Sequence, residues 1–213
     1  MEPREEILDA AAGLFVDRGF EGTSTREIAE AVGIRQASVY YHFPSGKDEI
    51  LAELLQRSVR PTVDKIEKIE ILGAENDVSP DVLLYLLVVL DVRALADAPH
   101  NTGALTGLAD VRRKKVFDSF GSARDELGAE YARLGSQVAT ACQDAGSAPD
   151  SDYLGTALLH LVEVVIGMRS EGRRITQTME GIVAAWCLRV CQADQARIDA
   201  AAARAADLIG ALE

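Results

Sequence analysis

The sequence predicts an all-α protein in which three short N-terminal helices precede a larger helical part. Three observations carry this prediction. Apolar residues recur with a helical period along most of the 213-residue chain, and no stretch shows the sustained alternation of a strand. Capping residues, prolines and glycines punctuate this pattern where helices would begin and end. The longest apolar run, Val82 to Leu90, has nine residues, about half of the roughly 20 that a membrane span requires.

The composition is that of an ordinary globular protein. Hydrophobic residues make up 48% of the chain and charged residues 26%, which excludes low-complexity disorder and collagen-like repeats. The first residues are charged and include no apolar segment of the kind that a signal peptide needs. We therefore expect a cytoplasmic protein with no membrane partner.

The cysteine pattern points to packing rather than chemistry. Cys142, Cys187 and Cys191 form no Cys-x-x-Cys pair. Cys187 and Cys191 are four residues apart on one helix face, where we expect small buried hydrophobic side chains. We expect neither a disulfide nor a metal site, and no pattern calls for a cofactor.

The first helix is expected over residues 3–18. Pro3 occupies the first-turn position that favours proline, and Glu5 and Glu6 follow near the positive end of the helix dipole. Gly19 ends the helix. One apolar stripe runs along it, formed by Ile7, Leu8, Ala11, Leu14 and Phe15.

Two more short helices follow at the spacing of a helix-turn-helix. Ser24 and Glu27 have the capping-box spacing, which predicts a helix start. Gly33 ends this second helix and can take the left-handed conformation that the turn requires. A third helix is expected over residues 36–42, where the sequence Phe-Pro-Ser-Gly then breaks the pattern.

The larger part begins with a long amphipathic helix from Lys47 to about residue 73. Pro61 should kink or interrupt it. The helix at 80–97 starts with a cap, a proline and an acid in the expected order, and is apolar nearly all round, so we expect it at the centre of a core. Residues 99–107 are expected to form a turn or short helix.

Four further segments complete the chain. The helix at 109–145 contains Gly121, Gly128 and Gly135 at seven-residue spacing. This spacing indicates either a thin face that another backbone approaches or a chance arrangement. After a linker at 146–152, helices are expected at 152–170, 176–192 and 195–212.

Residues 7–51, ILDAAAGLFVDRGFEGTSTREIAEAVGIRQASVYYHFPSGKDEIL, resemble the DNA-binding domain of TetR-family (tetracycline-repressor-like) transcriptional regulators. The matches include the Ile-Leu-Asp-Ala-Ala start, the Arg-Gly-Phe before Thr-Ser, and Tyr40-x-His42-Phe43 before Ser45-Gly46-Lys47. The resemblance implies a DNA-binding domain at 1–46 and an effector-binding and dimerisation domain at 47–213. It also implies a homodimeric repressor that binds a palindromic double-stranded operator and is released by a small-molecule effector.

The resemblance places the DNA contacts on and around the third helix. Gln36 can make a bidentate contact with adenine, and Arg35 can read guanine or reach a phosphate. Many relatives have a small polar residue at the position of Arg35, which leaves its role open. The full set of expected DNA-binding residues is Thr25, Arg26, Arg35, Gln36, Ala37, Ser38, Tyr40, Tyr41, His42 and Lys47.

The net charge of −12, taken alone, argues against a DNA partner because it repels phosphate. The stretch 33–47 nevertheless contains Arg35 and Lys47 and no acidic residue. Charges more than about 8 Å away are largely screened at physiological salt. The acidity therefore does not exclude DNA, but it predicts weak non-specific binding.

In the larger part we expect an effector pocket and a dimer interface. The pocket would place a few polar tips in an apolar wall; its candidates, each of which could instead be ordinary core, are Tyr85, His100, Phe117, Tyr131, His160 and Met168. The interface would be built from the helices at 152–170 and 176–192, with intramolecular core as the alternative. Its candidates are Leu154, Leu158, Leu161, Val165, Ile182, Trp186 and Arg189.

The sequence also bears on three alternatives: a metal site, a protein without operator binding, and an enzyme. His160 and Glu163 have a spacing that could bind metal, but without a third ligand a core histidine is favoured. An all-helical ligand-binding or scaffold protein that has lost operator binding is the main alternative, although such a protein would be expected to lack Gln36, Tyr40 and Lys47. An enzyme is not expected, because no nucleophile-elbow, zincin, P-loop or Rossmann signature is present.

Overall fold

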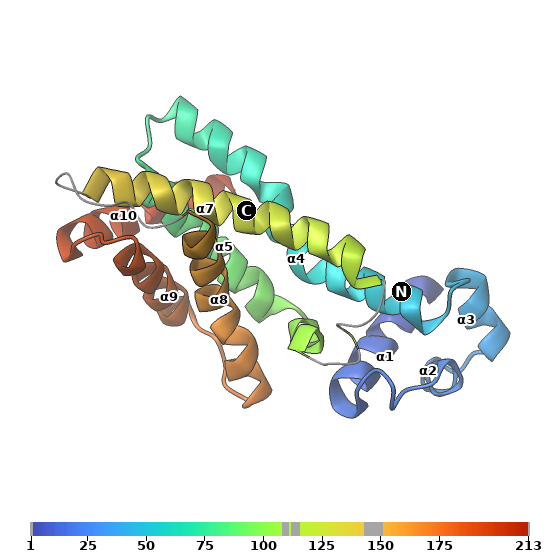
Figure 1. The fold of residues 1–213 in the computed structure, drawn as a ribbon. Coiled ribbons are helices and arrows are strands. Elements are labelled where there is room, and N and C mark those ends of the chain that lie inside the picture. The colour runs from blue at the N-terminus through green and yellow to red at the C-terminus, as the bar shows by residue number, and fades with distance from the viewer. Residues whose placement is uncertain (1, 108–110, 112–115, 143–150, 213) are drawn as a thin grey trace. The chain divides into compact units, whose positions relative to one another are not determined.

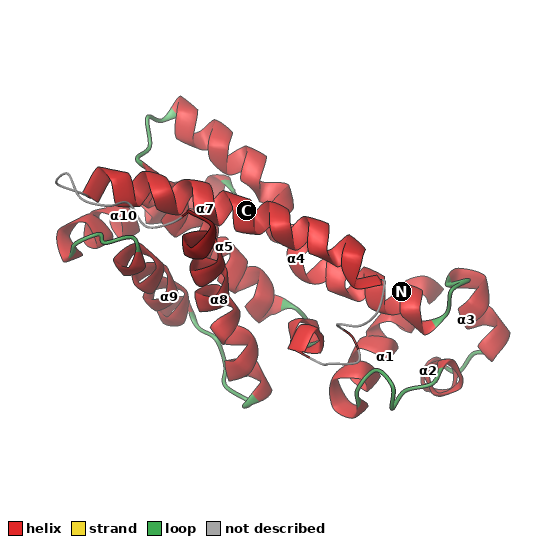
Figure 2. Ribbon diagram, in the orientation of Figure 1, coloured by secondary structure: helices red, strands yellow, loops and turns green. Residues whose placement is uncertain are grey.

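The computed structural model describes residues 2–107, 111, 116–142 and 151–212, without the side chains of 116–120 and 151–152. Within these ranges every regular element is a helix and there is no strand, which confirms the all-α prediction (Figure 2). No helix in the described ranges is both long and apolar enough to cross a membrane. Most of the expected linker at 146–152 lies outside the described residues.

The helices lie close to the positions that the sequence predicts (Figure 1). In chain order they are α1 (Pro3–Arg18), α2 (Thr25–Val32), α3 (Gln36–His42), α4 (Lys47–Glu75), α5 (Pro80–Asp97), the 3₁₀ helix η1 (Thr102–Gly107), α7 (Val116–Cys142), α8 (Ser151–Ser170), α9 (Gln177–Val190), α10 (Gln195–Leu208) and the 3₁₀ helix η2 (Ile209–Ala211).

The chain forms two compact units. The head unit consists of Met1–Val59 and Ala98–Ala123, and the body unit of Arg60–Asp97 and Arg124–Glu213. The first turns of α4 therefore belong to the head unit, whereas we expected a functional division at residue 46. That division remains a prediction about which residues bind DNA and which bind an effector.

Short-range signals shape the head unit. The backbone N–H of Glu27 donates to Ser24 Oγ, and the backbone N–H of Ser24 donates to the Glu27 carboxylate at 2.8 Å, which completes the predicted capping box. Gly33 ends α2 in the left-handed conformation, at φ 76°. Phe15, Phe20 and Phe43 are fully buried in this unit.

An ion-pair network joins α1 to the first part of α4. Arg57 donates to Glu5 and to Glu53, each at 2.7 Å, and Arg4 also binds Glu53. The hydrogen bond from Arg57 holds the pKa of Glu5 below its usual value. The Arg4 guanidinium lies 4.6 Å from the centre of the Phe43 ring. These contacts explain why the head unit extends past the predicted boundary at residue 46.

Of the two predicted effects of Pro61, a kink or an interruption, the interruption is absent, because α4 runs from Lys47 to Glu75 as one helix. Proline removes one intrahelical hydrogen bond from the helix interior. Apolar side chains on both sides of it, Leu55, Val59 and Val63, are buried and hold the adjoining turns in place. Packing therefore offsets the loss of one backbone hydrogen bond.

Helix α5 is the centre of the body unit, as its apolar sequence predicts. It packs against α8, α9 and α10 (Figure 1). Ten of its residues are buried, and two of these, Asp81 and Asp91, are carboxylates. Buried carboxylates need partners because their desolvation is costly.

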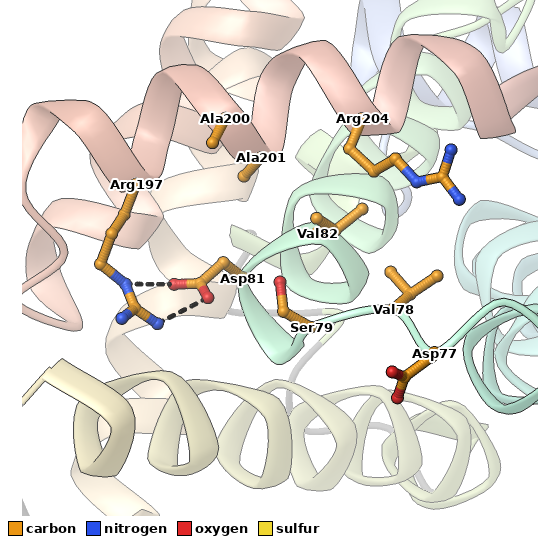
Figure 3. Close-up of a pocket in the computed structure, with 9 residues that line it drawn as sticks. All are labelled: Asp77, Val78, Ser79, Asp81, Val82, Arg197, Ala200, Ala201 and Arg204. Atoms are coloured by element: carbon orange, nitrogen blue, oxygen red, sulfur yellow. Dashed lines mark hydrogen bonds and ion pairs between the residues drawn. The ribbon is translucent and has the colours of Figure 1, made fainter.

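Both carboxylates have partners. Asp81 forms a two-pronged ion pair with Arg197 of α10, with Nη2 to Oδ2 at 2.7 Å (Figure 3). Asp91 Oδ1 accepts a hydrogen bond from the Thr62 hydroxyl of α4, and its Oδ2 accepts one from the Tyr131 hydroxyl of α7, both at 2.9 Å. Burial raises the pKa of Asp91 to about 6. Asp91 thus lies at a polar centre within an apolar core.

Glycines allow α7 and α8 to approach closely. A β-carbon on Gly155 would lie 2.7 Å from the carbonyl oxygen of Gly128 and 2.7 Å from the β-carbon of Ala132. One on Gly135 would lie 2.7 Å from Leu158. The close approach to backbone thus requires Gly155 of α8, while Gly135 makes room for leucine side chains and a β-carbon on Gly128 would lie 4.0 Å from Leu159. At Gly121 the space is open.

Candidate nucleic-acid interface

Helix α3 presents one face to solvent and one to the core of the head unit. Val39 is fully buried and anchors the helix, which packs on α2. On the outer face Arg35, Gln36 and Ala37 are exposed, and Tyr41 is exposed over 81% of its surface. The structure therefore places four of the predicted DNA-binding residues on one accessible surface.

A hydrogen-bonded group orders the side chains between α2 and α3. The Gln36 Nε2 donates to Thr25 Oγ1 at 2.8 Å, and the Thr25 and Tyr40 hydroxyls lie 3.3 Å apart. Thr25 is almost fully buried, so it fixes both neighbours. Gln36 retains a second N–H and a free carbonyl oxygen, which together can still address an adenine edge.

Beside this group lies a hollow of about 400 Å³ at the start of α2. Helix N-termini attract anions because their first N–H groups point outward and the dipole is positive there. Tyr40 and Lys47 line the hollow, and so do two carboxylate residues, Glu21 and Glu27. The helix start and the Lys47 charge favour a phosphate there, whereas the carboxylates of Glu21 and Glu27 oppose one. The hollow is lined by Glu21, Gly22, Thr23, Ser24, Thr25, Glu27, Tyr40, Ser45, Gly46 and Lys47.

Lys47 has a structural role that the sequence did not indicate. Its Nζ donates to the carbonyl oxygens of Phe20 and Thr23, each at 3.0 Å, and lies 4.4 Å from the centre of the Phe20 ring. Glu21 Oε2 lies 3.8 Å away. The ammonium group therefore holds the connection between α1 and α2 and supplies positive charge beside the hollow.

The remaining predicted DNA contacts are less constrained. Arg26 is exposed and pairs with Glu30 at 2.8 Å, one turn along α2. Arg35 precedes α3 as its N-cap residue, without a side-chain capping bond. The His42 ring lies edge-on to the Tyr41 ring at 5.1 Å, and Ser38 is half-buried. Contacts of these side chains with DNA remain a prediction.

Gly46 is a residue of this site that sequence reasoning missed. It has φ 66°, and a β-carbon there would lie 3.1 Å from the Tyr40 ring. The position thus combines a left-handed backbone with the space that Tyr40 needs. Its place in the Ser-Gly-Lys match was the available signal.

The predicted effector residues do not form one group. His100 belongs to the head unit, where its Nε2 lies 2.9 Å from Asp9 Oδ1, and Tyr131 is fully buried against Asp91. His160 is exposed rather than in the core, and its Nδ1 lies 2.7 Å from the Thr156 carbonyl oxygen. Tyr85 and Met168 are half-buried in the body unit, and the side chain of Phe117 lies outside the description.

Metal binding gains no support from this arrangement. Glu163, the potential partner of His160, is paired with Arg124 at 2.8 Å. Among the described residues, no cluster of three His, Cys, Asp or Glu side chains could hold a metal ion. Cys187 and Cys191 are buried, as expected for hydrophobic packing, and burial raises the pKa of Cys191 to about 12.

The predicted dimer residues divide by the direction in which they face. Leu154, Leu158 and Val165 are buried within the protomer, and Leu161 is half-buried. Leu154 and Leu158 of α8 pack against Gly135 of α7, where a side chain would clash with them. Ile182, Trp186 and Arg189 are exposed, and Arg189 donates to Gln195 at 2.7 Å. The latter three follow one another at helical spacing along α9.

A three-helix head in which a glycine turn joins the second helix to an exposed third helix defines a helix-turn-helix DNA-binding protein. Residues 7–54 match the family model described as bacterial regulatory proteins, tetR family. The crystal structure of AmtR from Mycobacterium smegmatis is 34% identical, covers 96% of this chain and 94% of its own, and superposes with a TM-score of 0.80. This chain belongs to the TetR family.

Two other relatives extend the comparison. The HTH-type transcriptional repressor KstR2 of Rhodococcus jostii is 35% identical over 102 residues, which are 48% of this chain and 47% of KstR2. The chain thus spans about half the length of this curated relative. A structure of AibR in complex with isovaleryl coenzyme A and operator DNA matches with a TM-score of 0.65 at 18% identity, and covers 88% of this chain and 95% of that one. At 18% identity, the similarity to AibR shows a shared fold only.

The contacts of Lys47 lead to a stability prediction. Lys47→Met removes two charge-assisted hydrogen bonds and the contact with the Phe20 ring, and we expect it to lower the free energy of unfolding by about 2–4 kcal/mol. Urea unfolding at neutral pH measures the change. Lys68→Met, on the exposed part of α4, makes the same charge change and should stay within about 0.5 kcal/mol of wild type. Equal stability of the two variants would contradict the role of Lys47.

Proposed function

We propose that this protein is a ligand-responsive transcriptional regulator, most simply a repressor, that binds a palindromic DNA operator as a homodimer. A small-molecule effector would release it. The observation that carries this proposal is the exposed face of α3 beside the hollow at the start of α2. One surface offers base-reading side chains, and the other offers donors for a phosphate.

The charge distribution suits specific rather than general DNA binding. Residues 33–47 include Arg35 and Lys47 and no carboxylate, while the whole chain carries a net charge of −12. Long-range repulsion lowers affinity for arbitrary DNA, and screening at physiological salt leaves the local contacts effective. Most of the operator affinity must therefore come from base contacts and from pairing two heads.

Two heads require a dimer, and the exposed apolar surface of α8 and α9 supports one. Val164, Ile182, Trp186 and Val190 are each about two-fifths exposed, although large apolar side chains normally avoid solvent. A twofold axis would place this surface against its own copy. Aromatic residues such as Trp186 are enriched at the centres of interfaces. We therefore propose this outward surface, in place of the inward leucines of α8, as the dimer interface.

The role of Gln36 is testable by selection of bound DNA. We expect wild-type protein to enrich, from genomic fragments, an inverted repeat whose half-sites are about 10 bp apart or a multiple of this. Gln36→Ala should relax base choice at one position of each half-site by about 1–3 kcal/mol, because a bidentate base contact is lost. The measurement is competition binding with single-base variants of the enriched duplex.

Gln56→Ala provides the control, because Gln56 is an exposed glutamine on α4 of the same unit. It should leave base choice unchanged. Unaltered base choice in Gln36→Ala would refute the assignment of α3 as the reading helix. Failure of the wild-type protein to enrich any sequence would favour the alternative, a helical ligand-binding protein without an operator.

The dimer surface has its own test. Trp186→Glu places a charge at the centre of the proposed interface, and we expect the variant to elute as a monomer at micromolar concentration, where wild type is a dimer. Ile71→Glu alters an exposed apolar residue on α4, away from α8 and α9, and should remain dimeric. Light scattering coupled to size exclusion distinguishes the two states. A dimeric Trp186→Glu variant would place the interface elsewhere.

A further inference from the structure

The chain passes between the two units at three points, all within the described residues. It passes within α4 after Val59, beyond α5 after Asp97, and within α7 after Ala123. Any signal that travels along the backbone between body and head must use one of these connections. Helices α4, α5 and α7 are therefore the elements whose placement in the body unit bears on the head.

One buried network takes a residue from each of these three helices. Thr62 of α4 and Tyr131 of α7 donate to the two carboxylate oxygens of Asp91 on α5, each at 2.9 Å. Thr62 and Tyr131 are 1% and 0% exposed, and Asp91 is 3% exposed. The network is thus a closed hydrogen-bonded bridge between the three connecting helices, without access for water to replace its members.

The surroundings of Asp91 make this arrangement costly to change. Cys187 of α9 and Glu163 of α8 also interact electrostatically with Asp91, and Glu163 is paired with Arg124. None of these groups can replace a lost hydroxyl donor for Asp91, because Glu163 is an acceptor and Cys187 a weak donor. A buried carboxylate oxygen without a donor would be strongly unfavourable.

The position of Thr62 along α4 adds to its importance. It directly follows Pro61, which has no N–H to donate to the preceding turn. The backbone ladder of α4 is thus one bond short immediately before the hydroxyl that fixes the helix to Asp91. The Thr62 hydroxyl therefore attaches α4 to Asp91 next to the turn that lacks a backbone hydrogen bond.

We propose that the Thr62–Asp91–Tyr131 network is a positioning element that sets the operator affinity of the effector-free protein. This inference rests on the proposed function. By fixing α4, α5 and α7 in the body unit, the network restricts the positions that the head of each protomer can adopt. Loss of one hydrogen bond releases a connecting helix, so operator binding must then order it again at the expense of affinity.

The experiment compares variants in their affinity for the duplex that wild-type protein enriches. Thr62→Val and Tyr131→Phe each remove one hydroxyl with little change of shape. Thr62→Ser keeps the hydroxyl. Val183→Ala is the control for general destabilisation, because Val183 is fully buried in α9 and donates to no member of the network. Affinities are measured well below the melting temperature of every variant, so that all are folded.

We expect Thr62→Val and Tyr131→Phe to lose at least tenfold in operator affinity, mainly through faster dissociation. Thr62→Ser and Val183→Ala should stay within about threefold of wild type, although Val183→Ala also lowers the melting temperature. If Val183→Ala loses as much affinity as Thr62→Val, the effect is general destabilisation and the inference is wrong. Unchanged or increased affinity in Thr62→Val overturns it as well.

Different results would contradict the proposed function and the positioning role of the network. Absence of any enriched duplex for wild-type protein contradicts the proposed function. An enriched duplex that all four variants bind equally well contradicts only the positioning role of the network. If Thr62→Val does not fold, the operator affinities of Tyr131→Phe and Val183→Ala are compared instead. A larger loss in Tyr131→Phe supports the inference, and an equal loss contradicts it.

Discussion

Burying the carboxylate of Asp91 imposes the strongest constraint on the body unit. An ionised carboxylate in an apolar core is tolerated only where donors reach both oxygens. Here the donors come from α4 and α7, at sequence separations of 29 and 40 residues. Helices α4 and α7 must therefore keep a fixed register relative to α5. The apolar contacts of α5 with α8, α9 and α10 complete a core around this fixed point.

The head unit is organised by a different kind of interaction. Its helix ends are set by neighbours in sequence, through the capping box of Ser24 and Glu27 and the left-handed Gly33. Lys47 adds a contact between parts of the head that are distant in sequence, because its ammonium group hydrogen-bonds to the α1–α2 connection. The same side chain brings positive charge to the hollow at the start of α2. The proposed phosphate contact would thus share one residue with the packing of the head unit, which limits what can replace Lys47.

The sequence was most informative where the physics is local. Caps, glycines and helical periodicity predicted nearly every helix, and the motif around α3 singled out side chains that the structure leaves exposed. It was least informative where long-range packing decides. Leu158 and Trp186 look alike in a periodic pattern, yet one faces the core of the protomer and the other solvent. Neither the partner of Asp91 on α4 nor the inward hydrogen bonds of Lys47 follow from spacing, because both depend on tertiary approach.

The central claim is that the Asp91 carboxyl group is desolvated where residues of α4, α5 and α7 meet in the core of the body unit. Its most direct test is the difference in unfolding free energy between wild type and Asp91→Asn, followed from pH 3.5 to 8 by Trp186 fluorescence at low protein concentration. Since burial raises the pKa of Asp91 from 3.8 to about 6, the folded state holds this proton more tightly than the unfolded state. Wild type should therefore lose stability relative to Asp91→Asn as pH rises through this interval, by about 3 kcal/mol in total. A difference that does not vary with pH, or that favours wild type as pH rises, would contradict the claim.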